Sequence, residues 1–394
     1  MLSLDSLINN GSFCVIPFVH QEKQFEGRHN ICCYHNQLQS DNLNQNSHQS
    51  FNSKKINVIR QKMVNGIRPE ECNGCYNQED SGVVSARQIE NKSWVNWSDV
   101  HDTLSNILVK FQNNEELSPI SYDLRYSNTC TLKCRMCNSS SSSSINAEYK
   151  KINHNWPEKF WFVQNPRINH EIDLTTEIHK IYLAGGEPLV EPLNLELLSK
   201  VADLNPNVNL LINTSFNLVN KEFVDVLNRF NSLTFVVSLD GVGKLNDYIR
   251  NGSKFDTVIE NIEKFRHHNI MFSTTVSLYN IFKISELVEF TTKKYPEYYH
   301  GINIVNDVSE LFIENTPPEL RTELINDLEN LLEWVPDNVH VGVKNIITIL
   351  KLDNFESKNF TNFIKYTSIL DKERGESILD VENKFSPYFI DVIK

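Results

Sequence analysis

The stretch that decides the fold is residues 120–144, ISYDLRYSNTCTLKCRMCNSSSSSS. It begins with a short run rich in branched apolar side chains, which is typical of a β-strand. Three cysteines follow within eight positions: Cys130, Cys134 and Cys137. A structural zinc site is normally closed by four ligands and a disulfide joins two cysteines, so a group of three needs another explanation.

Three thiolates can bind three irons of a four-iron cluster and leave the fourth iron open for another ligand. The sequence has no apolar run long enough to span a membrane and no signal-peptide pattern at its start, so we expect a cytoplasmic protein without a membrane span. Thiols stay reduced in that compartment, and the eight cysteines of the chain therefore indicate metal binding rather than disulfides.

Further along the chain, short apolar runs alternate with helical patterns. The strand-like runs occupy residues 120–127, 178–186, 208–215, 233–241, 271–278 and 300–307. Between them, apolar residues recur at helical spacing, as at Val258, Ile262 and Phe265. Strands that alternate with helices pair in parallel, which predicts an α/β fold, a partial (β/α)6 barrel of the TIM type. A doubly wound open sheet is the alternative.

We expect three domains in the 394 residues: a cysteine-rich domain over 1–115, the barrel over 116–307 and a helical extension over 308–394. The serine run 139–144 indicates the start of a helix with one serine as N-cap, and a phosphate-binding tract is the alternative. Residues 371–375, DKERG, are typical of a helix end with charge pairs and are given no function. The net charge of −12 argues against a nucleic-acid partner.

With these motifs the chain resembles the radical S-adenosylmethionine (SAM) superfamily. Its members carry CxxxCxxC after the first barrel strand, where this sequence has Cys130, Cys134 and Cys137. They also carry a GGEP motif after the second strand, matched here by Gly185, Gly186, Glu187 and Pro188. Met136 departs from the pattern, since the family usually has an aromatic residue at that position.

The resemblance implies a 4Fe-4S cluster on the three cysteines and a SAM molecule whose methionine amino group binds the GGEP motif. Four more residues align with positions that contact the ribose or carboxylate of SAM: Asn213, Ser238, Asp240 and Arg250. Asn280 is a further candidate of this kind. In the implied reaction, an electron from a donor such as flavodoxin or ferredoxin reduces the cluster. SAM is then cleaved to methionine and a 5′-deoxyadenosyl radical, which abstracts hydrogen from a substrate.

The N-terminal cysteines resemble the auxiliary-cluster modules called SPASM and twitch. The matching residues are Cys14, Cys32 and the pair Cys72 and Cys75. Cys32 follows Gly27 with the Gly-x4-Cys spacing of these modules. The resemblance implies a second 4Fe-4S cluster with four cysteine ligands. These modules usually follow the barrel, whereas this one precedes it. Zinc on the same four cysteines is the alternative, and Cys33 is the alternative to Cys32 as ligand.

The resulting hypothesis is a radical SAM enzyme that modifies a peptide or protein side chain, because auxiliary modules often accompany peptide maturation in related proteins. A small-molecule substrate, such as a sugar, nucleotide or amino-acid derivative, is the first alternative. The second is a non-catalytic iron–sulfur electron carrier. The GGEP motif argues against the carrier, since a carrier has no need of a SAM pocket.

Overall fold

The computed structural model describes residues 4–24, 29–32, 47–96, 100–152, 172, 174–352 and 354–389. Gly27 and Cys33 lie outside these residues, as does most of 153–173. By its internal contacts the chain divides into two compact units. The first comprises residues 1–128, 165–212 and 221–233, and the second comprises 129–164, 213–220 and 234–394. The division into three domains expected from the sequence stays a prediction.

The first unit contains the N-terminal helices and the first strands. Its elements are α1 (Leu4–Ile8), α2 (Ile16–Val19), β1 (His20–Lys23), β2 (His29–Asn30), α3 (Ser47–Phe51), α4 (Lys54–Val64), η1 (Glu70–Cys72), α5 (Asn73–Asp80), α6 (Ala86–Val95), α7 (His101–Gln112), β3 (Ser121–Leu124), β4 (Lys180–Leu183), η3 (Pro188–Val190), α9 (Pro192–Leu204), β5 (Asn209–Thr214, whose last two residues belong to the second unit) and α10 (Lys221–Leu227).

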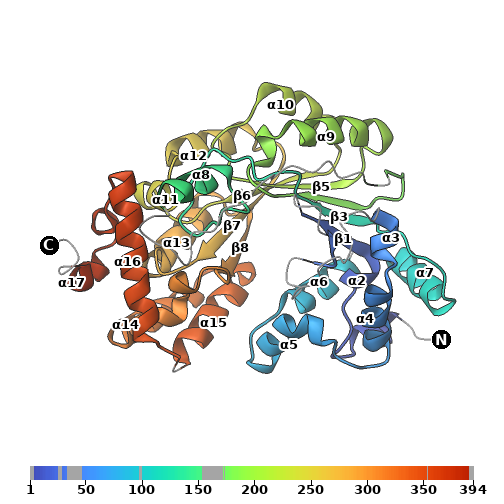
Figure 1. Ribbon diagram of the computed structural model, residues 1–394, viewed down its shortest axis with the longest axis horizontal. Coiled ribbons are helices and arrows are strands. Elements are labelled where there is room, and N and C mark those ends of the chain that lie inside the picture. Colours follow the sequence, from blue (N-terminus) through green and yellow to red (C-terminus); the bar gives the residue numbers. More distant parts are fainter. Residues whose placement is uncertain are drawn as a thin grey trace. The chain divides into compact units, whose positions relative to one another are not determined.

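The strands of the first unit pair mainly in parallel. β3 pairs with β4, and β4 with β5, so that Tyr122, Ile181 and Leu210 stand in one row across the sheet. β1 pairs in parallel with the other edge of β3 (Figure 1), and β2 is antiparallel to β1. The sequence patterns did not predict β1, because HQEK is polar throughout although three of its four residues are buried.

Helices α1, α2, α4, α6 and α7 share one hydrophobic core in the first unit. Phe13, Phe18, Ile59, Met63 and Trp94 are each at most 1 % exposed there. The helices begin where the sequence supplies caps. The Ser53 side chain accepts from the backbone N–H of Ile56 at the start of α4, and Ser85 and Gln88 form a capping box at the start of α6.

The second unit contains the later strands and the C-terminal helices. Its elements are α8 (Ser143–Ile152), β6 (Leu233–Ser238, from Thr234 in this unit), α11 (Lys244–Ile249), α12 (Phe255–Lys264), β7 (Asn269–Val276), η4 (Ile281–Lys283), α13 (Ile284–Lys294), β8 (Tyr299–Ile304), η5 (Ser309–Leu311), η6 (Ile313–Asn315), α14 (Pro318–Leu332), α15 (Asp337–Lys351), α16 (Ser357–Arg374), η7 (Ile378–Asp380), η8 (Asn383–Phe385) and α17 (Ser386–Phe389).

β6, β7 and β8 pair in parallel in chain order. Along β6 and β7 every second side chain is buried, as expected for strands of which one face is buried and the other is less so. α11 and α12 connect β6 to β7, and α13 connects β7 to β8. The six strand-like runs of the sequence all contain a strand, β3 to β8, and the predicted α/β fold with parallel strands is confirmed.

The C-terminal residues are helical, as predicted. α14 buries Leu324, Leu328 and Leu331. α15 lies so close to β8 that a Cβ on Gly342 would stand 2.5 Å from Cβ of Ile302. α16, drawn in red in Figure 1, buries Phe363, Tyr366 and other residues in a second core and ends at Gly375, whose φ is +65°.

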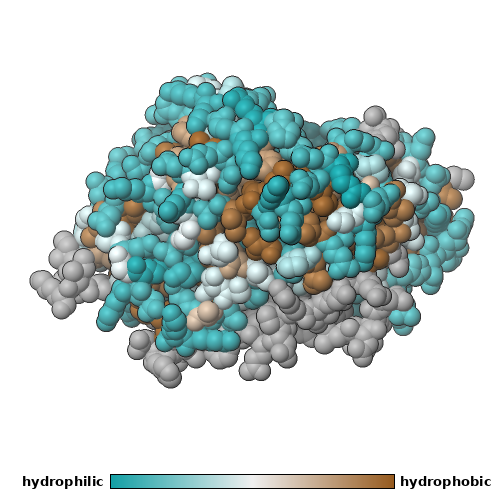
Figure 2. All heavy atoms as spheres, turned by 90° about the horizontal axis from the view of Figure 1, so that it is seen from above, coloured by the Kyte–Doolittle hydropathy of each residue, from teal (hydrophilic) through white to brown (hydrophobic). Residues whose placement is uncertain are grey.

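Figure 2 shows one face of the molecule, on which hydrophilic residues cover much of the described surface and a patch of hydrophobic residues lies between them. Such mixing is ordinary for protein surfaces. Within the described residues, every helix is too short or too polar to span a bilayer.

Candidate active site

The loop that carries Cys130, Cys134 and Cys137 follows β3 in the chain and leads into α8. It forms turns and bends rather than regular secondary structure, so other contacts must fix its path. The Cys137 N–H donates to the Cys134 carbonyl at 3.0 Å, which brings these two residues into one turn. The Leu132 N–H approaches Cys130 Sγ at 3.4 Å, and the three thiol-bearing residues are all partly buried.

The serine run holds the first of these cysteines. Ser142 is the N-cap of α8, because its Oγ accepts from the Ile145 N–H, and this confirms the predicted helix start. The hydroxyls of Ser143 and Ser144 also bind the backbone of Cys130: its N–H donates to Ser143 Oγ at 3.1 Å, and Ser144 donates to its carbonyl at 2.7 Å. The sequence analysis did not predict that Ser143 and Ser144 bind the backbone of Cys130, because a serine run indicates only the start of a helix.

Arg250, directly after α11, lies beside the second cysteine. Its guanidinium nitrogen is 3.8 Å from Cys134 Sγ, and its Nε is 2.6 Å from Asp240 Oδ2. The other Asp240 oxygen accepts from the Thr275 N–H at 2.8 Å. Asp240 is fully buried, and both of its oxygens face groups of the protein. The carboxylate therefore holds Arg250 in place next to the thiol.

Asn213 and Ser238 lie together at the ends of β5 and β6. The Ser238 hydroxyl donates to Asn213 Oδ1 at 3.2 Å, and both side chains are partly exposed. Asn280 has a different position: it is buried, and its amide donates to the carbonyls of Asp240 and Thr275. Asn280 therefore fastens the ends of β6 and β7 to each other.

The GGEP segment belongs to the first unit. Gly185 has a φ of +116°, and a Cβ at this position would stand 2.8 Å from the Ser127 carbonyl oxygen. The Gly186 N–H donates to the same carbonyl at 3.2 Å. The Glu187 side chain accepts from the Leu189 N–H and caps η3. Only glycine fits the Gly185 position, so the motif has a local structural reason of its own.

The N-terminal cysteines lie in the first unit. Cys14, Cys32 and Cys72 all pack against its hydrophobic core. Cys72 and Cys75 are near enough to Cys14 that their negative charge would raise the pKa of its thiol, adding to the larger effect of burial.

A buried ion pair lies close to these cysteines. Arg87 is bonded to both oxygens of Glu79, at 2.8 and 2.6 Å, and it donates to the Phe13 carbonyl at 2.7 Å. The positive charge of Arg87 lowers the pKa of the Cys14 thiol, although less than burial raises it. Burial thus disfavours the Cys14 thiolate, and the charge of Arg87 offsets a small part of that effect.

The described cysteines, seven in number, are free thiols. No group of three or more His, Cys, Asp or Glu side chains in the described part of the chain is arranged to hold a single metal ion. The ligands of an iron–sulfur cluster bind separate irons, so they do not need to converge on one point.

The chemistry of the three loop cysteines fits a cluster. Burial raises the pKa of the Cys137 thiol, and the charges of Cys134 and Cys130 raise it further. Buried thiolates need positive charge beside them, which iron would supply together with Arg250.

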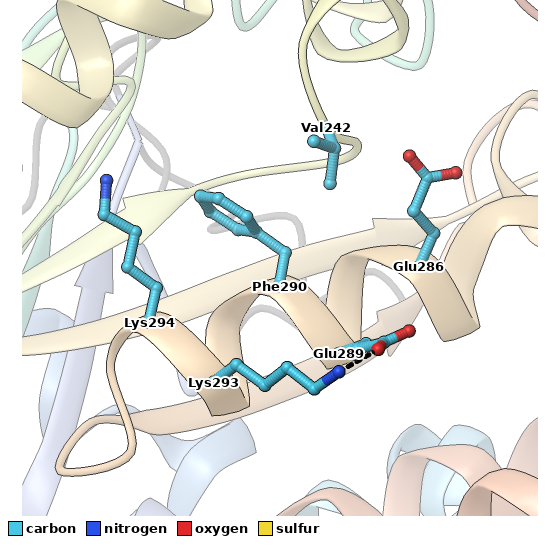
Figure 3. A pocket seen from close by; sticks show the side chains of 6 residues that line it. All are labelled: Val242, Glu286, Glu289, Phe290, Lys293 and Lys294. Carbon is cyan, nitrogen blue, oxygen red and sulfur yellow. Dashed lines mark hydrogen bonds and ion pairs between the residues drawn. The ribbon is translucent and has the colours of Figure 1, made fainter.

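A shallow pocket of about 520 Å³ lies beside α13 (Figure 3). Val242 and Phe290 supply its apolar side chains, and Glu289 pairs with Lys293 at its edge. Its lining contains none of the predicted site residues.

A sequence model of the radical SAM superfamily matches residues 124–293. This range includes the three loop cysteines, the GGEP segment, Asn213, Ser238, Asp240 and Arg250. The sporulation killing factor maturation protein SkfB of Bacillus subtilis (strain 168) is 28 % identical over 176 residues, which are 43 % of this chain and 39 % of SkfB. The match thus spans well under half of that relative.

Two solved structures resemble the chain at low TM-scores. Streptococcus suis SuiB bound to precursor peptide SuiA has a TM-score of 0.38 and 16 % identity, over 72 % of this chain and 62 % of that one. The protein anSMEcpe with bound AdoMet has a TM-score of 0.37 and 15 % identity, over 54 % and 59 % of the two chains. At these scores the likenesses carry no argument.

Proposed function

We propose that the chain is a radical SAM enzyme, with a 4Fe-4S cluster on Cys130, Cys134 and Cys137 and with SAM as its second cofactor. The observation that carries the proposal is the superfamily match over residues 124–293, in which the CxxxCxxC motif lies on a loop fixed by Ser143, Ser144 and other groups. A cluster held by these three cysteines would, when reduced, supply the electron for cleavage of SAM to methionine and a 5′-deoxyadenosyl radical, which would take hydrogen from the substrate.

The predicted site residues have separate tasks in this proposal. Gly185 and Gly186 let the backbone come close to SAM, and the GGEP segment with Pro188 and Glu187 receives its methionine amino group. Asn213 and Ser238 offer amide and hydroxyl groups to its ribose or carboxylate. Arg250 is held by Asp240 beside Cys134 and places positive charge next to the thiolate side of the cluster.

We further propose that the substrate is a peptide or protein side chain. SkfB is named as the maturation protein of a sporulation killing factor, and its similarity to this chain supports a maturation reaction. The N-terminal cysteines support it as well, since they resemble modules that accompany peptide maturation. A small-molecule substrate is the alternative, and the experiment below distinguishes it from a peptide substrate.

The second metal site of the proposal consists of Cys14, Cys32, Cys72 and Cys75, which would hold an auxiliary 4Fe-4S cluster. Three of these side chains pack against one core, and the nearby Arg87 supplies positive charge that favours thiolates. An external donor such as flavodoxin or ferredoxin would reduce the SAM-binding cluster. Zinc on the same ligands remains the alternative, and metal analysis distinguishes the two.

The test is anaerobic reconstitution with iron and sulfide, followed by SAM and dithionite. We expect 5′-deoxyadenosine and methionine from the reconstituted chain and neither product from Cys134→Ala. Iron-loaded protein that forms no 5′-deoxyadenosine would contradict the enzyme and favour the electron carrier. To identify the substrate class, short peptides encoded beside the gene are added and their masses measured. A mass change that depends on SAM supports the peptide, and turnover of small molecules alone contradicts it.

A further inference from the structure

Arg135, between the second and third loop cysteines, is fully buried. Its guanidinium lies 3.7 Å from the centre of the Tyr248 ring and donates from Nε to the Tyr248 carbonyl at 3.0 Å. The same group is 2.7 Å from carboxylate oxygens of both Asp371 and Glu376, at the end of α16. An arginine between two cysteines thus reaches residues more than two hundred positions further along the chain.

The backbone of the loop is fixed at the same place. The N–H groups of Lys133 and Arg135 donate to the carbonyls of Asn251 and Ile249, each at 2.8 Å. From α16, the Tyr366 hydroxyl donates to the Arg135 carbonyl at 3.1 Å. Tyr149 then approaches both the Tyr366 hydroxyl, at 3.1 Å, and the Cys137 carbonyl, at 3.5 Å. The loop is therefore bonded on both sides of Cys134.

A second ion pair joins α16 to the helix after the loop. Arg374 bonds both oxygens of Glu148, at 3.1 and 2.6 Å, and both side chains are at most 3 % exposed. Lys133 donates to Glu148 as well, at 3.0 Å. These bonds lower the pKa of Glu148, although burial alone would raise it. The charged residues of 371–375 thus do more than end a helix.

Stability alone does not explain this arrangement. Buried charges lose hydration that their partners repay only in part, and apolar residues of the same size often stabilise a core as well. Buried charge networks fix geometry instead, because each group has directional partners. Here the contacts described above join Arg135 and Tyr366 to the cysteine loop and to the residues that bind it.

We infer that Tyr366, Asp371, Arg374 and Glu376, which we call the C-terminal brace, position the cysteine loop through Arg135 and Glu148. The functional consequence of this inference rests on the proposed function. If the loop binds the cluster, the brace holds Cys134 and Cys137 in the geometry that the cluster requires. Arg135 is a positioning residue, since it acts through the two cysteines beside it.

The first test needs no metal. Full-length protein without iron is treated with iodoacetamide, and alkylation of each cysteine is followed by peptide mapping. Tyr366→Phe removes the hydroxyl bonded to the Arg135 carbonyl, and Thr316→Val is its control. Thr316 is also fully buried, and its hydroxyl donates to the Ile313 carbonyl at 2.7 Å instead of the loop. We expect about tenfold faster alkylation of Cys134 and Cys137 in Tyr366→Phe, as a lost buried hydrogen bond allows, and no change in Thr316→Val.

Equal rates in the two variants would overturn the inference. So would an acceleration in Tyr366→Phe that extends equally to Cys14 and Cys72, because that pattern reports general loosening.

The second test uses the reconstituted chain and the EPR spectrum of its reduced cluster. Arg135→Gln should change the spectrum and lose iron to a chelator several-fold faster than wild type, and Arg135→Lys should recover part of both effects because it keeps the charge. An unchanged spectrum and iron loss in Arg135→Gln would contradict the brace. If the wild-type cluster forms but does not cleave SAM, the proposed function is wrong. The alkylation and EPR measurements still show whether the brace positions the loop, because neither depends on SAM cleavage.

Discussion

At the scale of single residues, Gly185 shows how a motif can have a structural cause that is separate from binding. Its φ of +116° and the Ser127 carbonyl, 2.8 Å from where a Cβ would stand, both exclude a side chain. We predict that Gly185→Ala lowers the free energy of unfolding by about 3 kcal/mol, the sum of backbone strain and the clash. Equilibrium unfolding in urea measures the change.

Gly82 is the matched control for this substitution. Its φ is also positive, at +82°, but a Cβ there would meet nothing within 4 Å. Gly82→Ala should therefore cost about 1 kcal/mol, from backbone strain alone. Equal losses in the two variants would show that the contact with Ser127 carries no weight.

At the scale of elements, Ser142 joins the start of α8 to the cysteine loop. Its Oγ caps the helix at Ile145 and its hydroxyl donates to the Leu132 carbonyl at 2.9 Å. We predict that Ser142→Ala lowers the free energy of unfolding by about 1 to 2 kcal/mol. Ser141→Ala, one position earlier and outside these contacts, should change it by less than about 0.5 kcal/mol. Chemical denaturation of both variants tests this, and similar losses would argue against the cap.

His300, which lies on β8 and contacts β7 and α13, should make the stability of the protein depend on pH. This side chain is buried between the Thr274 and Thr291 hydroxyls, at 2.7 and 2.9 Å, and burial lowers its pKa to about 4. The unfolded chain takes up a proton near pH 6.5, while the folded chain does so only near 4. The stability due to neutral His300 is therefore complete above pH 6.5 and is lost as the pH falls from there toward 4.

Between pH 7 and pH 5, this residue alone should remove about 2 kcal/mol of stability. Urea unfolding at the two pH values gives the slope for wild type and for His300→Gln, which cannot titrate. His20 is also buried with a pKa lowered to about 4, so the difference between the two proteins isolates His300. A variant with the wild-type slope would contradict the assignment.

The sequence patterns were sufficient to predict the strands that carry a local apolar periodicity. All six strand-like runs contain a strand, because burial on helix-covered strands leaves a continuous or alternating apolar signal. β1 was missed since His20, Gln21 and Glu22 are polar side chains that find buried polar partners, which no periodicity reveals.

The same limit applies to the candidate site. CxxxCxxC and GGEP could be found by spacing, and the Ser238 hydroxyl donates to Asn213, while their role in SAM binding stays a prediction. The C-terminal brace could not be found this way. Arg135 is 241 positions from Glu376 and 231 from Tyr366, and contacts at such separations leave no trace in a local pattern.

At the scale of the whole molecule, the two cysteine sets belong to different units: Cys14, Cys32, Cys72 and Cys75 to the first, and the loop cysteines to the second. Cys14, Cys32 and Cys72 pack against a core of the first unit, and Cys137 packs against a core of the second. We therefore predict that the sites load independently. Wild type should bind about eight irons, and Cys14→Ala and Cys134→Ala about four each, because each variant loses one four-iron cluster.

The two variants should differ in activity even though they hold the same amount of iron. Cys14→Ala should still cleave SAM to 5′-deoxyadenosine, whereas Cys134→Ala should not, since only the loop leaves an iron open. Iron, zinc and sulfide analysis, with product assay by chromatography, measures both effects. About four irons and one zinc in wild type would replace the auxiliary cluster by a zinc site. If Cys14→Ala still bound about eight irons, Cys14 would not be a ligand, because the loop site holds only its own four irons and cannot bind those of a lost auxiliary cluster.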